Sequence, residues 1–162
     1  MAWPILIIAF GAALDLAAKL WARASLEPYG AATEFLPFVA LRLTFNHGVS
    51  FSLLSFEGEI ARLTLLLATA ALTASFALWA FRSQGLERIA ASSIVAGALA
   101  NVIDRAVYGT VTDYPDLHFG AWHPFVFNLA DVWITAGAIL LVFCQFSRKQ
   151  SNVAVRNSSK TT

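Results

Sequence analysis

The strongest constraint on the fold of this chain comes from four apolar stretches, each long enough to cross a lipid bilayer. A helix needs about 20 predominantly apolar residues to span roughly 30 Å of hydrocarbon. The sequence predicts such helices over residues 2–22, 60–81, 86–103 and 126–146. Because 58% of the 162 residues are apolar and only 13% are charged, the chain lacks the charged exterior of a soluble domain. We therefore expect an all-α membrane protein, with residues 1–162 forming one membrane-embedded domain.

Lysine and arginine residues are distributed unevenly between the loops, which predicts the orientation of the helices. Six of the eleven basic residues lie in the link between the second and third stretches or in the polar tail 147–162, namely Arg82, Arg88, Arg148, Lys149, Arg156 and Lys160. By the positive-inside rule, these segments and both termini face the cytoplasm, and loops 23–59 and 104–127 face outward. The first stretch has no basic start and contains Asp15 and Lys19, so we expect it to be retained rather than removed as a secretion signal. The tail is expected to be disordered.

The outer loop 23–59 contains two segments with the alternation of a half-buried strand. Apolar and polar side chains alternate over residues 41–46 and again over 49–53. The intervening Asn46, His47 and Gly48 are residues typical of a turn. We expect a small antiparallel sheet on the outer membrane surface, with its apolar face toward lipid or the helices.

Polar residues within the predicted helices form three clusters at helical spacing, all near the outer ends of their helices. The clusters are Asp15 with Lys19, Asn101 with Asp104 and Arg105, and Asn128 with Asp131. Each has an ordinary structural explanation, because an i, i+4 ion pair can fix helix packing and asparagine can hydrogen-bond between helices. For Asp104 we favour such a structural role, as an interfacial charge pair with Arg105. The shared depth of the clusters nevertheless indicates a site at the outer surface, since polar side chains are costly in hydrocarbon.

Asp113 and Asp131 are harder to explain by packing. They fall near the same predicted membrane surface, no basic residue lies between them, and the nearest in sequence is Arg105. Two carboxyl groups brought close cannot both ionise, so the pair shares a proton. Aspartic proteases use this arrangement: one carboxylate takes a proton from water, and the other carboxyl group hydrogen-bonds the scissile carbonyl. The two aspartates therefore predict a catalytic dyad that uses water as the nucleophile.

Other chemistries have less support in the sequence. His47, His118 and His123 show no metal-ligand spacing, so we expect no metal site and no cofactor. A net charge of +1 argues against a nucleic-acid partner. A small proton-coupled transporter or channel stays open as an alternative because intramembrane acids also relay protons, although the spans show no inverted repeat. A non-catalytic scaffold would explain Asp15 with Lys19, but not the two unpaired aspartates.

Five short motifs of this chain resemble those of the lipoprotein signal peptidase (signal peptidase II) family. Residues 15–19 match its D-x-x-x-K box and residues 46–51 match its N-x-G-x-x-F box. The other three motifs are 101–105, 111–114 and 127–131. The motifs occur in the family's order, and together with the four spans they cover nearly the whole chain.

The resemblance implies an aspartyl endopeptidase of the bacterial inner (plasma) membrane. Such enzymes remove the signal peptide from prolipoproteins whose cysteine already carries a diacylglyceryl group, and they cut just before that cysteine. By position, Asp113 and Asp131 correspond to the family's catalytic pair. The residues that correspond to its polar surroundings and supports are Asn46, Gly48, Asn101, Arg105, Asn128, Asp15 and Lys19.

The same resemblance implies a fold of four helices, an outer β-cradle and a short interfacial helix. The expected partners are diacylated prolipoproteins, membrane lipids and the inhibitor globomycin, with no cofactor. We expect a monomer whose active site lies at the outer (periplasmic) face.

Overall fold

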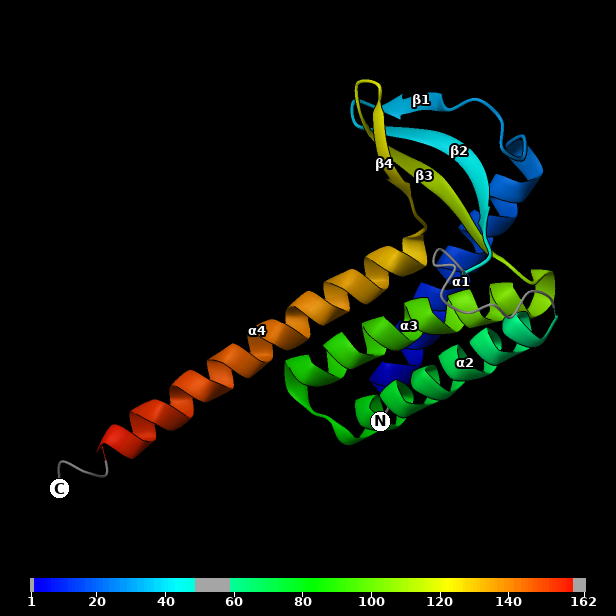
Figure 1. The fold of residues 1–162 in the computed structure, drawn as a ribbon. Coiled ribbons are helices and arrows are strands. Elements are labelled where there is room, and N and C mark those ends of the chain that lie inside the picture. The colour runs from blue at the N-terminus through cyan, green and yellow to red at the C-terminus, as the bar shows by residue number, and fades with distance from the viewer. Residues whose placement is uncertain (1, 49–58, 159–162) are drawn as a thin grey trace.

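The computed structural model describes residues 2–48 and 59–158, which form four long helices and one four-stranded sheet (Figure 1). The helices are α1 (Ala2–Ser25), α2 (Glu59–Arg82), α3 (Gly85–Tyr108) and α4 (Leu129–Ser158). The strands are β1 (Thr33–Leu36), β2 (Val39–Asn46), β3 (Val111–Phe119) and β4 (Trp122–Val126). The sheet stands at one end of the helices, where α1 and α3 end and α4 begins; we call this the sheet end.

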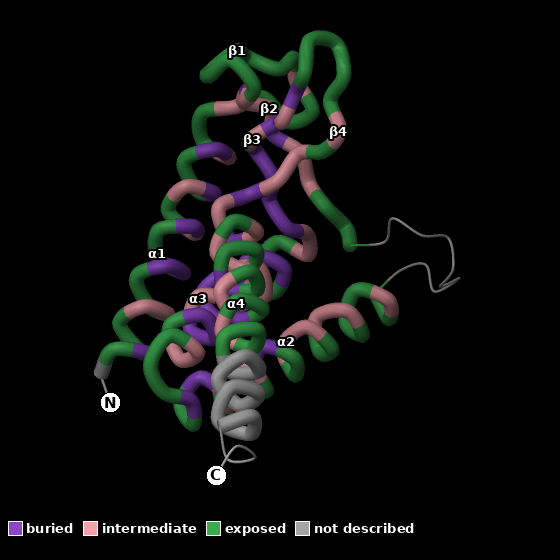
Figure 2. The backbone as a smooth tube through the Cα atoms, turned by 90° about the vertical axis from the view of Figure 1, so that its left-hand side faces the viewer, coloured by how far each residue is buried: buried purple, intermediate pink, exposed green. Residues whose placement is uncertain are grey.

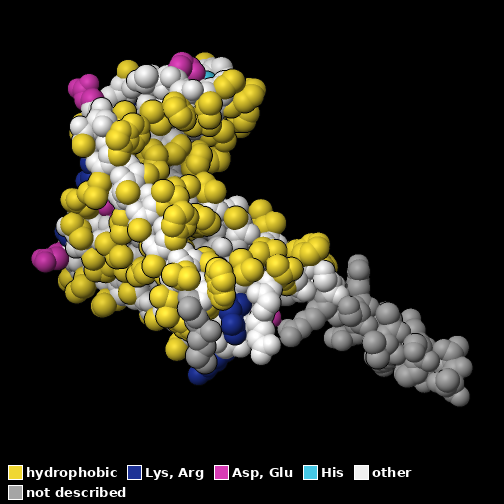
Figure 3. Space-filling view, turned by 180° about the vertical axis from the view of Figure 1, so that it is seen from behind, with side chains coloured by type: hydrophobic (Ala, Val, Ile, Leu, Met, Phe, Trp, Pro, Cys, Tyr) yellow, Lys and Arg dark blue, Asp and Glu magenta, His cyan; other side chains and the backbone are white. Residues whose placement is uncertain are grey.

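The four helices of the described residues are long and apolar enough to cross a membrane, which confirms the prediction of four such helices. The qualifying stretches are Trp3–Ser25, Glu59–Arg82, Gly85–Tyr108 and Leu129–Ser147. Large apolar side chains such as Leu67 and Phe143 are exposed, whereas many buried positions hold small residues. Buried residues lie along α1, α3 and β3 in Figure 2, and apolar side chains cover much of the face seen in Figure 3. A surface of this kind suits lipid rather than water.

Helix α3 lies at the centre of the bundle and packs against each of the other three helices. Small residues on its surface allow this close approach, and Ala90, Ala96 and Ala100 are fully buried. A Cβ atom added at Gly97 would lie 2.2 Å from the backbone oxygen of Ala130. Gly97 therefore sets how closely the first turn of α4 lies against α3.

The sheet is antiparallel throughout, with its strands in the order β1-β2-β3-β4. Strand β3 follows α3 and strand β4 leads into α4, so the chain between these helices forms half of the sheet. In the pairing of β2 with β3, Thr44 lies opposite Asp113 and Phe45 lies opposite Thr112. Asp113 is thus near the start of β3, where the sheet meets the helices (Figure 1).

The structure confirms part of the predicted sheet and adds strands that the sequence does not predict. Strand β2 contains the predicted strand 41–46, while the second predicted strand, 49–53, lies outside the described residues. Strands β3 and β4 occupy a segment that we expected to be a polar loop. The first four residues of β3 are all buried, polar and apolar alike, so the strand has no alternation between polar and apolar positions. A strand covered on both faces loses the period-2 signal.

The predicted start of the fourth helix and the end of the third are wrong by a few residues. Helix α4 begins at Leu129 rather than at residue 126, because Val126 is the last residue of β4 and Asn128 caps the helix. Helix α3 continues to Tyr108 rather than ending at residue 103.

The C-terminal segment also differs from the prediction. Helix α4 continues to Ser158, so the expectation that the tail is disordered is wrong over residues 148–158. That segment contains neither proline nor glycine, the residues that most strongly end helices. No short interfacial helix occurs within residues 2–48 and 59–158, and this expectation stays a prediction.

Candidate active site

Asn128 hydrogen-bonds both of the aspartates that the sequence singles out. Its side-chain Nδ2 donates to Oδ1 of Asp113 at 2.6 Å. Its side-chain Oδ1 accepts from the backbone N–H of Asp131 at 3.0 Å, and its own backbone N–H donates to Oδ2 of Asp131 at 3.2 Å. Asn128 is fully buried, so a low local dielectric strengthens these bonds. The structure thus brings Asp113 of β3 and Asp131 of α4 together through one asparagine.

The two bonds between Asn128 and Asp131 form a capping box at the start of α4. Asn128 is the N-cap residue, and Asp131, three residues later, accepts a hydrogen bond from the N-cap backbone. Such a cap stabilises a helix by about 1 kcal/mol. Asn128 and Asp131 are three residues apart because they form the N-cap of α4, and not because they share one face of the helix. This cap holds the Asp131 carboxylate in place at the first turn.

Asp113 is buried, and none of the ion pairs among the described residues involves it. Burial raises the pKa of Asp113 from its ordinary value of 3.8 to about 6. The hydrogen bonds from Asn128 and Asn46 lower this pKa, and the charge of Asp131 raises it. The carboxyl group of Asp113 therefore gains or loses its proton near neutral pH, as a general acid or base must.

A cavity of about 350 Å³ lies against Asp113 at the sheet end. Its wall is formed by Asp113, by Val126 and by residues 44–48, at the end of β2 and in the turn that follows. Asn46 and Gly48, both predicted as site residues, belong to this wall. One member of the aspartate pair therefore lines an open cavity at the surface.

The turn beside the cavity requires glycine at position 48. Gly48 has φ +76°, and its backbone N–H donates to Oδ1 of Asn46 at 2.8 Å. A Cβ atom at Gly48 would lie 2.3 Å from Leu65 of α2 and 3.6 Å from Nη2 of Arg105. Arg105 thus lies next to the turn, and it interacts electrostatically with Asp113 as well. The structure therefore places Arg105 in the same region as Asn46, Gly48 and Asp113.

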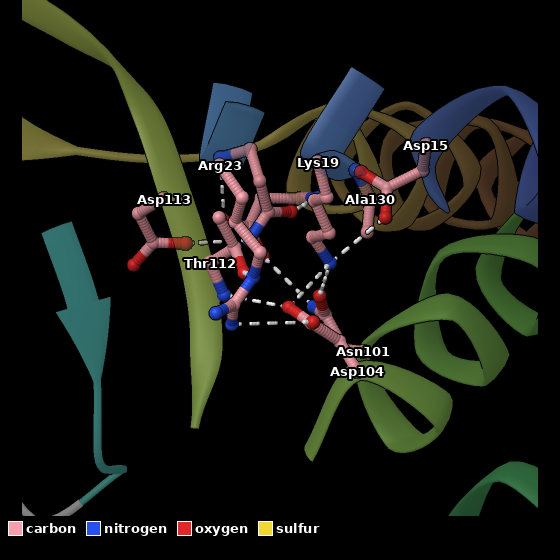
Figure 4. A network of polar contacts seen from close by, with 10 residues as sticks. Asp15, Lys19, Arg23, Asn101, Asp104, Thr112, Asp113 and Ala130 are labelled. Carbon is pink, nitrogen blue, oxygen red and sulfur yellow. Dashed lines mark hydrogen bonds and ion pairs between the residues drawn. The ribbon is translucent and has the colours of Figure 1, made fainter. Parts of the chain in front are cut away.

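Asp15 and Lys19 on α1 contact residues around Asp131 (Figure 4). Nζ of Lys19 lies 2.8 Å from Oδ2 of Asp15 and donates to Oδ1 of Asn101 at 2.5 Å. Nδ2 of Asn101 in turn donates to Oδ1 of Asp131 at 3.3 Å. Asp15 accepts a hydrogen bond from the backbone N–H of Ala130 at 2.7 Å. The expected pair is present, and both of its members are connected to the first turn of α4.

Asp104 has partners that its neighbours in the sequence do not predict. Its ion pairs are with Lys19 at 3.7 Å and Arg23 at 3.6 Å, both on α1, and its Oδ2 accepts from the backbone N–H of Thr112 at 2.6 Å. The expected neighbour, Arg105, contributes only an electrostatic interaction. Arg23 has a sequence signal in retrospect, because Asp15, Lys19 and Arg23 follow one another at four-residue steps on one helical face.

His47 belongs to the cavity wall, whereas His118 and His123 lie farther along the sheet. His118 and His123 stack with 5.4 Å between their ring centroids, and they contact Glu34 and Asp116 at 3.3 and 3.0 Å. Within residues 2–48 and 59–158, no three His, Cys, Asp or Glu side chains gather as a metal site would require.

Comparison with known proteins gives consistent matches in sequence. A family model described as signal peptidase (SPase) II matches residues 7–147. The lipoprotein signal peptidase of Hydrogenovibrio crunogenus is 36% identical over 136 residues, which cover 82% of this chain and 78% of that protein. Those of Burkholderia thailandensis and Paraburkholderia phymatum are 42% and 43% identical over 122 residues, which cover 74% of this chain and 74% of each relative.

Solved structures described as bacterial membrane enzymes share the fold. One, at 1.9 Å resolution, aligns with a TM-score of 0.77 and 25% identity over 90% of this chain and 93% of its own. Another, at 2.3 Å resolution, has a TM-score of 0.78 and is 24% identical, and the alignment covers 93% of this chain and 92% of that chain. These comparisons give no support to the transporter alternative. Because the family model covers most of the chain and the relatives and the fold agree with it, the chain belongs to the signal peptidase II family of membrane aspartyl proteases.

Proposed function

We propose that this protein is a membrane aspartyl endopeptidase that removes the signal peptide from diacylglyceryl-modified prolipoproteins, cutting just before the lipidated cysteine. The observation that carries the proposal is the connection of Asp113 to Asp131 through Asn128, beside a cavity at the sheet end. The relatives, each named lipoprotein signal peptidase, supply the class of substrate.

In the proposed reaction Asp113 is the general acid and Asp131 is the general base. The pKa of Asp113, raised by burial to about 6, leaves part of this group protonated near neutral pH. Because Asn128 donates to Oδ1 of Asp113, the acidic proton sits on Oδ2, where it can hydrogen-bond the scissile carbonyl oxygen.

The proton transfers then follow the usual order for an aspartic dyad. Asp131 takes a proton from water, whose oxygen adds to the carbonyl carbon while Asp113 protonates the carbonyl oxygen. The C–N bond breaks as Asp131 gives its proton to the leaving amine and Asp113 recovers its own from the new hydroxyl group. Both aspartates end in their starting protonation states.

The other predicted site residues act around this dyad. Asn101 and Asn128 hold the two carboxyl groups by hydrogen bonds, with Asp15 and Lys19 behind them. The groups that face the substrate backbone are Asn46, Gly48 and Arg105.

The membrane delivers the substrate to the site. The acyl chains of the modified cysteine stay in the bilayer and the signal peptide spans it, so the scissile bond is held at a fixed depth near the interface. The basic residues of the α2–α3 link support an orientation in which the sheet end lies at the periplasmic face of the inner membrane and both termini lie in the cytoplasm. The enzyme acts as a monomer among membrane lipids, and globomycin is expected to bind at the cavity.

The test is cleavage of a diacylated prolipoprotein by the full chain in detergent. The wild type should release the signal peptide, and Asp113→Asn or Asp131→Asn should each lower kcat roughly 10²- to 10⁴-fold, because either change removes a proton-transfer group. Asp116→Asn is the matched control, since Asp116 is also a buried aspartate of β3 but pairs with Arg42 and His123.

Two results would contradict the proposal. Full activity of a folded dyad variant would remove that residue from the chemistry. A folded wild-type protein that leaves the diacylated substrate intact would overturn the function itself.

A further inference from the structure

Three side chains behind the proposed dyad form a closed set of contacts between α1, α3 and β3 (Figure 4). Nε of Arg23 donates to Oγ1 of Thr112 at 2.8 Å, and the backbone N–H of Thr112 donates to Oδ2 of Asp104 at 2.6 Å. Nη2 of Arg23 lies 3.6 Å from Oδ1 of Asp104. Thr112 and Asp104 are both buried. The residue directly before Asp113 is therefore held by its backbone and by its side chain.

The guanidinium group of Arg23 is itself held by two aromatic rings. Its Cζ lies 3.8 Å from the ring centroid of Tyr108 at the end of α3 and 4.7 Å from that of Phe45 in β2. Phe45 lies opposite Thr112 in the register of the two strands. Arg23 thereby joins the ends of α1 and α3 to two neighbouring strands.

These contacts lie on the opposite side of β3 from the Asp113 side chain. Successive side chains of a strand point to opposite faces, so Thr112 and Asp113 face apart. In Figure 4, Asp113 lies on one side of the β3 ribbon and Asp104 on the other, with Arg23. Among the hydrogen bonds and ion pairs of the described residues, none joins Arg23 to Asp113, so any effect of Arg23 reaches Asp113 through the backbone.

We propose that Arg23 is a positioning residue for Asp113. Through Thr112 it holds the start of β3 against the ends of α1 and α3, which keeps the Asp113 carboxyl group within reach of Asn128. This role rests on the proposed protease function. A misplacement of about 1 Å in a reacting group can lower a rate about 100-fold, so a restraint on this strand has a direct effect on turnover.

The hydroxyl group of Thr112 gives the sharpest test. Thr112→Val keeps the shape of the side chain and removes the acceptor for Arg23, whereas Thr112→Ser keeps the hydroxyl group. With the full chain and a diacylated prolipoprotein, Thr112→Val should lower kcat roughly 10- to 100-fold while KM changes less than about threefold. Thr112→Ser should retain kcat within about threefold of the wild type, because the hydrogen bond survives.

Changes at Arg23 should act through the same contact. Arg23→Met should lower kcat at least as much as Thr112→Val. A variant that combines Arg23→Met with Thr112→Val should be no slower than Arg23→Met alone, because both changes break the same hydrogen bond. If Arg23→Met does not fold, the two Thr112 variants decide the question by themselves.

Matched controls separate positioning from general destabilisation. Thr73→Val removes a buried hydroxyl group of α2 that donates only to the backbone oxygen of Thr69, at 2.7 Å, and it should leave kcat unchanged. Arg88→Met is the control for the loss of an arginine, since Arg88 donates to Ser83 at the other end of the bundle. Hydrogen exchange over residues 111–116 should become faster in Thr112→Val and stay unchanged in Thr73→Val.

The outcomes distinguish this inference from the function on which it rests. If the wild type cleaves and Thr112→Val has the same kcat, the positioning role is overturned. It is also overturned if Thr112→Ser loses as much kcat as Thr112→Val. If the wild type does not cleave, the proposed function fails, and the exchange measurement still decides whether this contact restrains β3.

Discussion

Two buried aspartates lie three residues apart on β3, and their partners differ in kind. Asp113 accepts a hydrogen bond from the neutral amide of Asn128 at 2.6 Å. Asp116 lies 3.3 Å from Nε of Arg42 and 3.0 Å from Nδ1 of His123, so its neighbours can be cations. Both residues are buried, but only Asp113 lines the cavity at the sheet end.

Under the proposed function, this difference explains how one strand can hold a reactive and an unreactive carboxyl group. A cation beside a buried carboxylate compensates its charge. Amide donors compensate less, and burial then raises the pKa of Asp113 to about 6. We infer that Asp113 is available for proton transfer because its hydrogen-bond partners are amides and it forms no ion pair within the described part of the chain, whereas Asp116 serves the structure of the sheet.

Among the changes that test this difference between Asp113 and Asp116, replacement of Asn128 should lower kcat the most. Asn128→Ala removes the donor to Asp113 and the cap of α4, so we expect kcat to fall roughly 100- to 1,000-fold and stability to fall by about 1 kcal/mol. Asn128→Asp keeps the capping oxygen but replaces the amide donor with a third carboxyl group. It should be equally inactive and more stable than Asn128→Ala. Turnover and thermal unfolding in detergent measure both effects, and an active Asn128→Asp enzyme would refute the role of the amide.

The pH dependence of kcat/KM should report the raised pKa of Asp113. The protonated form of this group predominates below about pH 6 and is lost as the pH rises. If that form is the general acid, kcat/KM should fall roughly tenfold per pH unit above about pH 6, or about 100-fold by pH 8. In Asn128→Ala the decline should move to higher pH, because the hydrogen bond from Asn128 lowers this pKa. A kcat/KM that stays constant between about pH 6 and pH 8 would argue against Asp113 as the general acid.

Replacement of Asn101 should have a smaller effect, since Asn101 contacts only one member of the dyad. Asn101 donates to Asp131 and accepts from Lys19. Asn101→Ala should lower kcat about tenfold with the protein still folded, because the capping box continues to hold Asp131. Single-turnover cleavage measures this, and an unchanged rate would remove Asn101 from the support of the dyad.

The smallest effect on catalysis is expected for Asp116→Asn. The change leaves Arg42 and His123 beside a neutral side chain, so we expect a loss of roughly 1–2 kcal/mol in stability. Turnover should stay within about threefold of the wild type, since no reacting group changes. A loss of kcat as large as that of Asp113→Asn would show that the two aspartates do not differ in function as proposed.

Several features of the site could be predicted from local patterns in the sequence. Asp15 and Lys19 are four residues apart, and the structure pairs them. The separation of Asp113 and Asp131 from any basic residue indicated two carboxyl groups with unusual surroundings, and the structure connects both to Asn128. The partners of Asp104 were not predictable, because they come from α1 and β3 rather than from neighbouring positions.

The four membrane-spanning helices could be predicted from local sequence alone, because exposure to lipid requires long runs of apolar residues and such runs are local. Which polar groups meet at the sheet end depends on how the helices and strands pack. Lys19 bonds a side chain 82 positions away and Asp15 bonds a backbone group 115 positions away. Contacts of this range depend on how closely the helices approach, as at Gly97, and no local spacing in the chain records that distance.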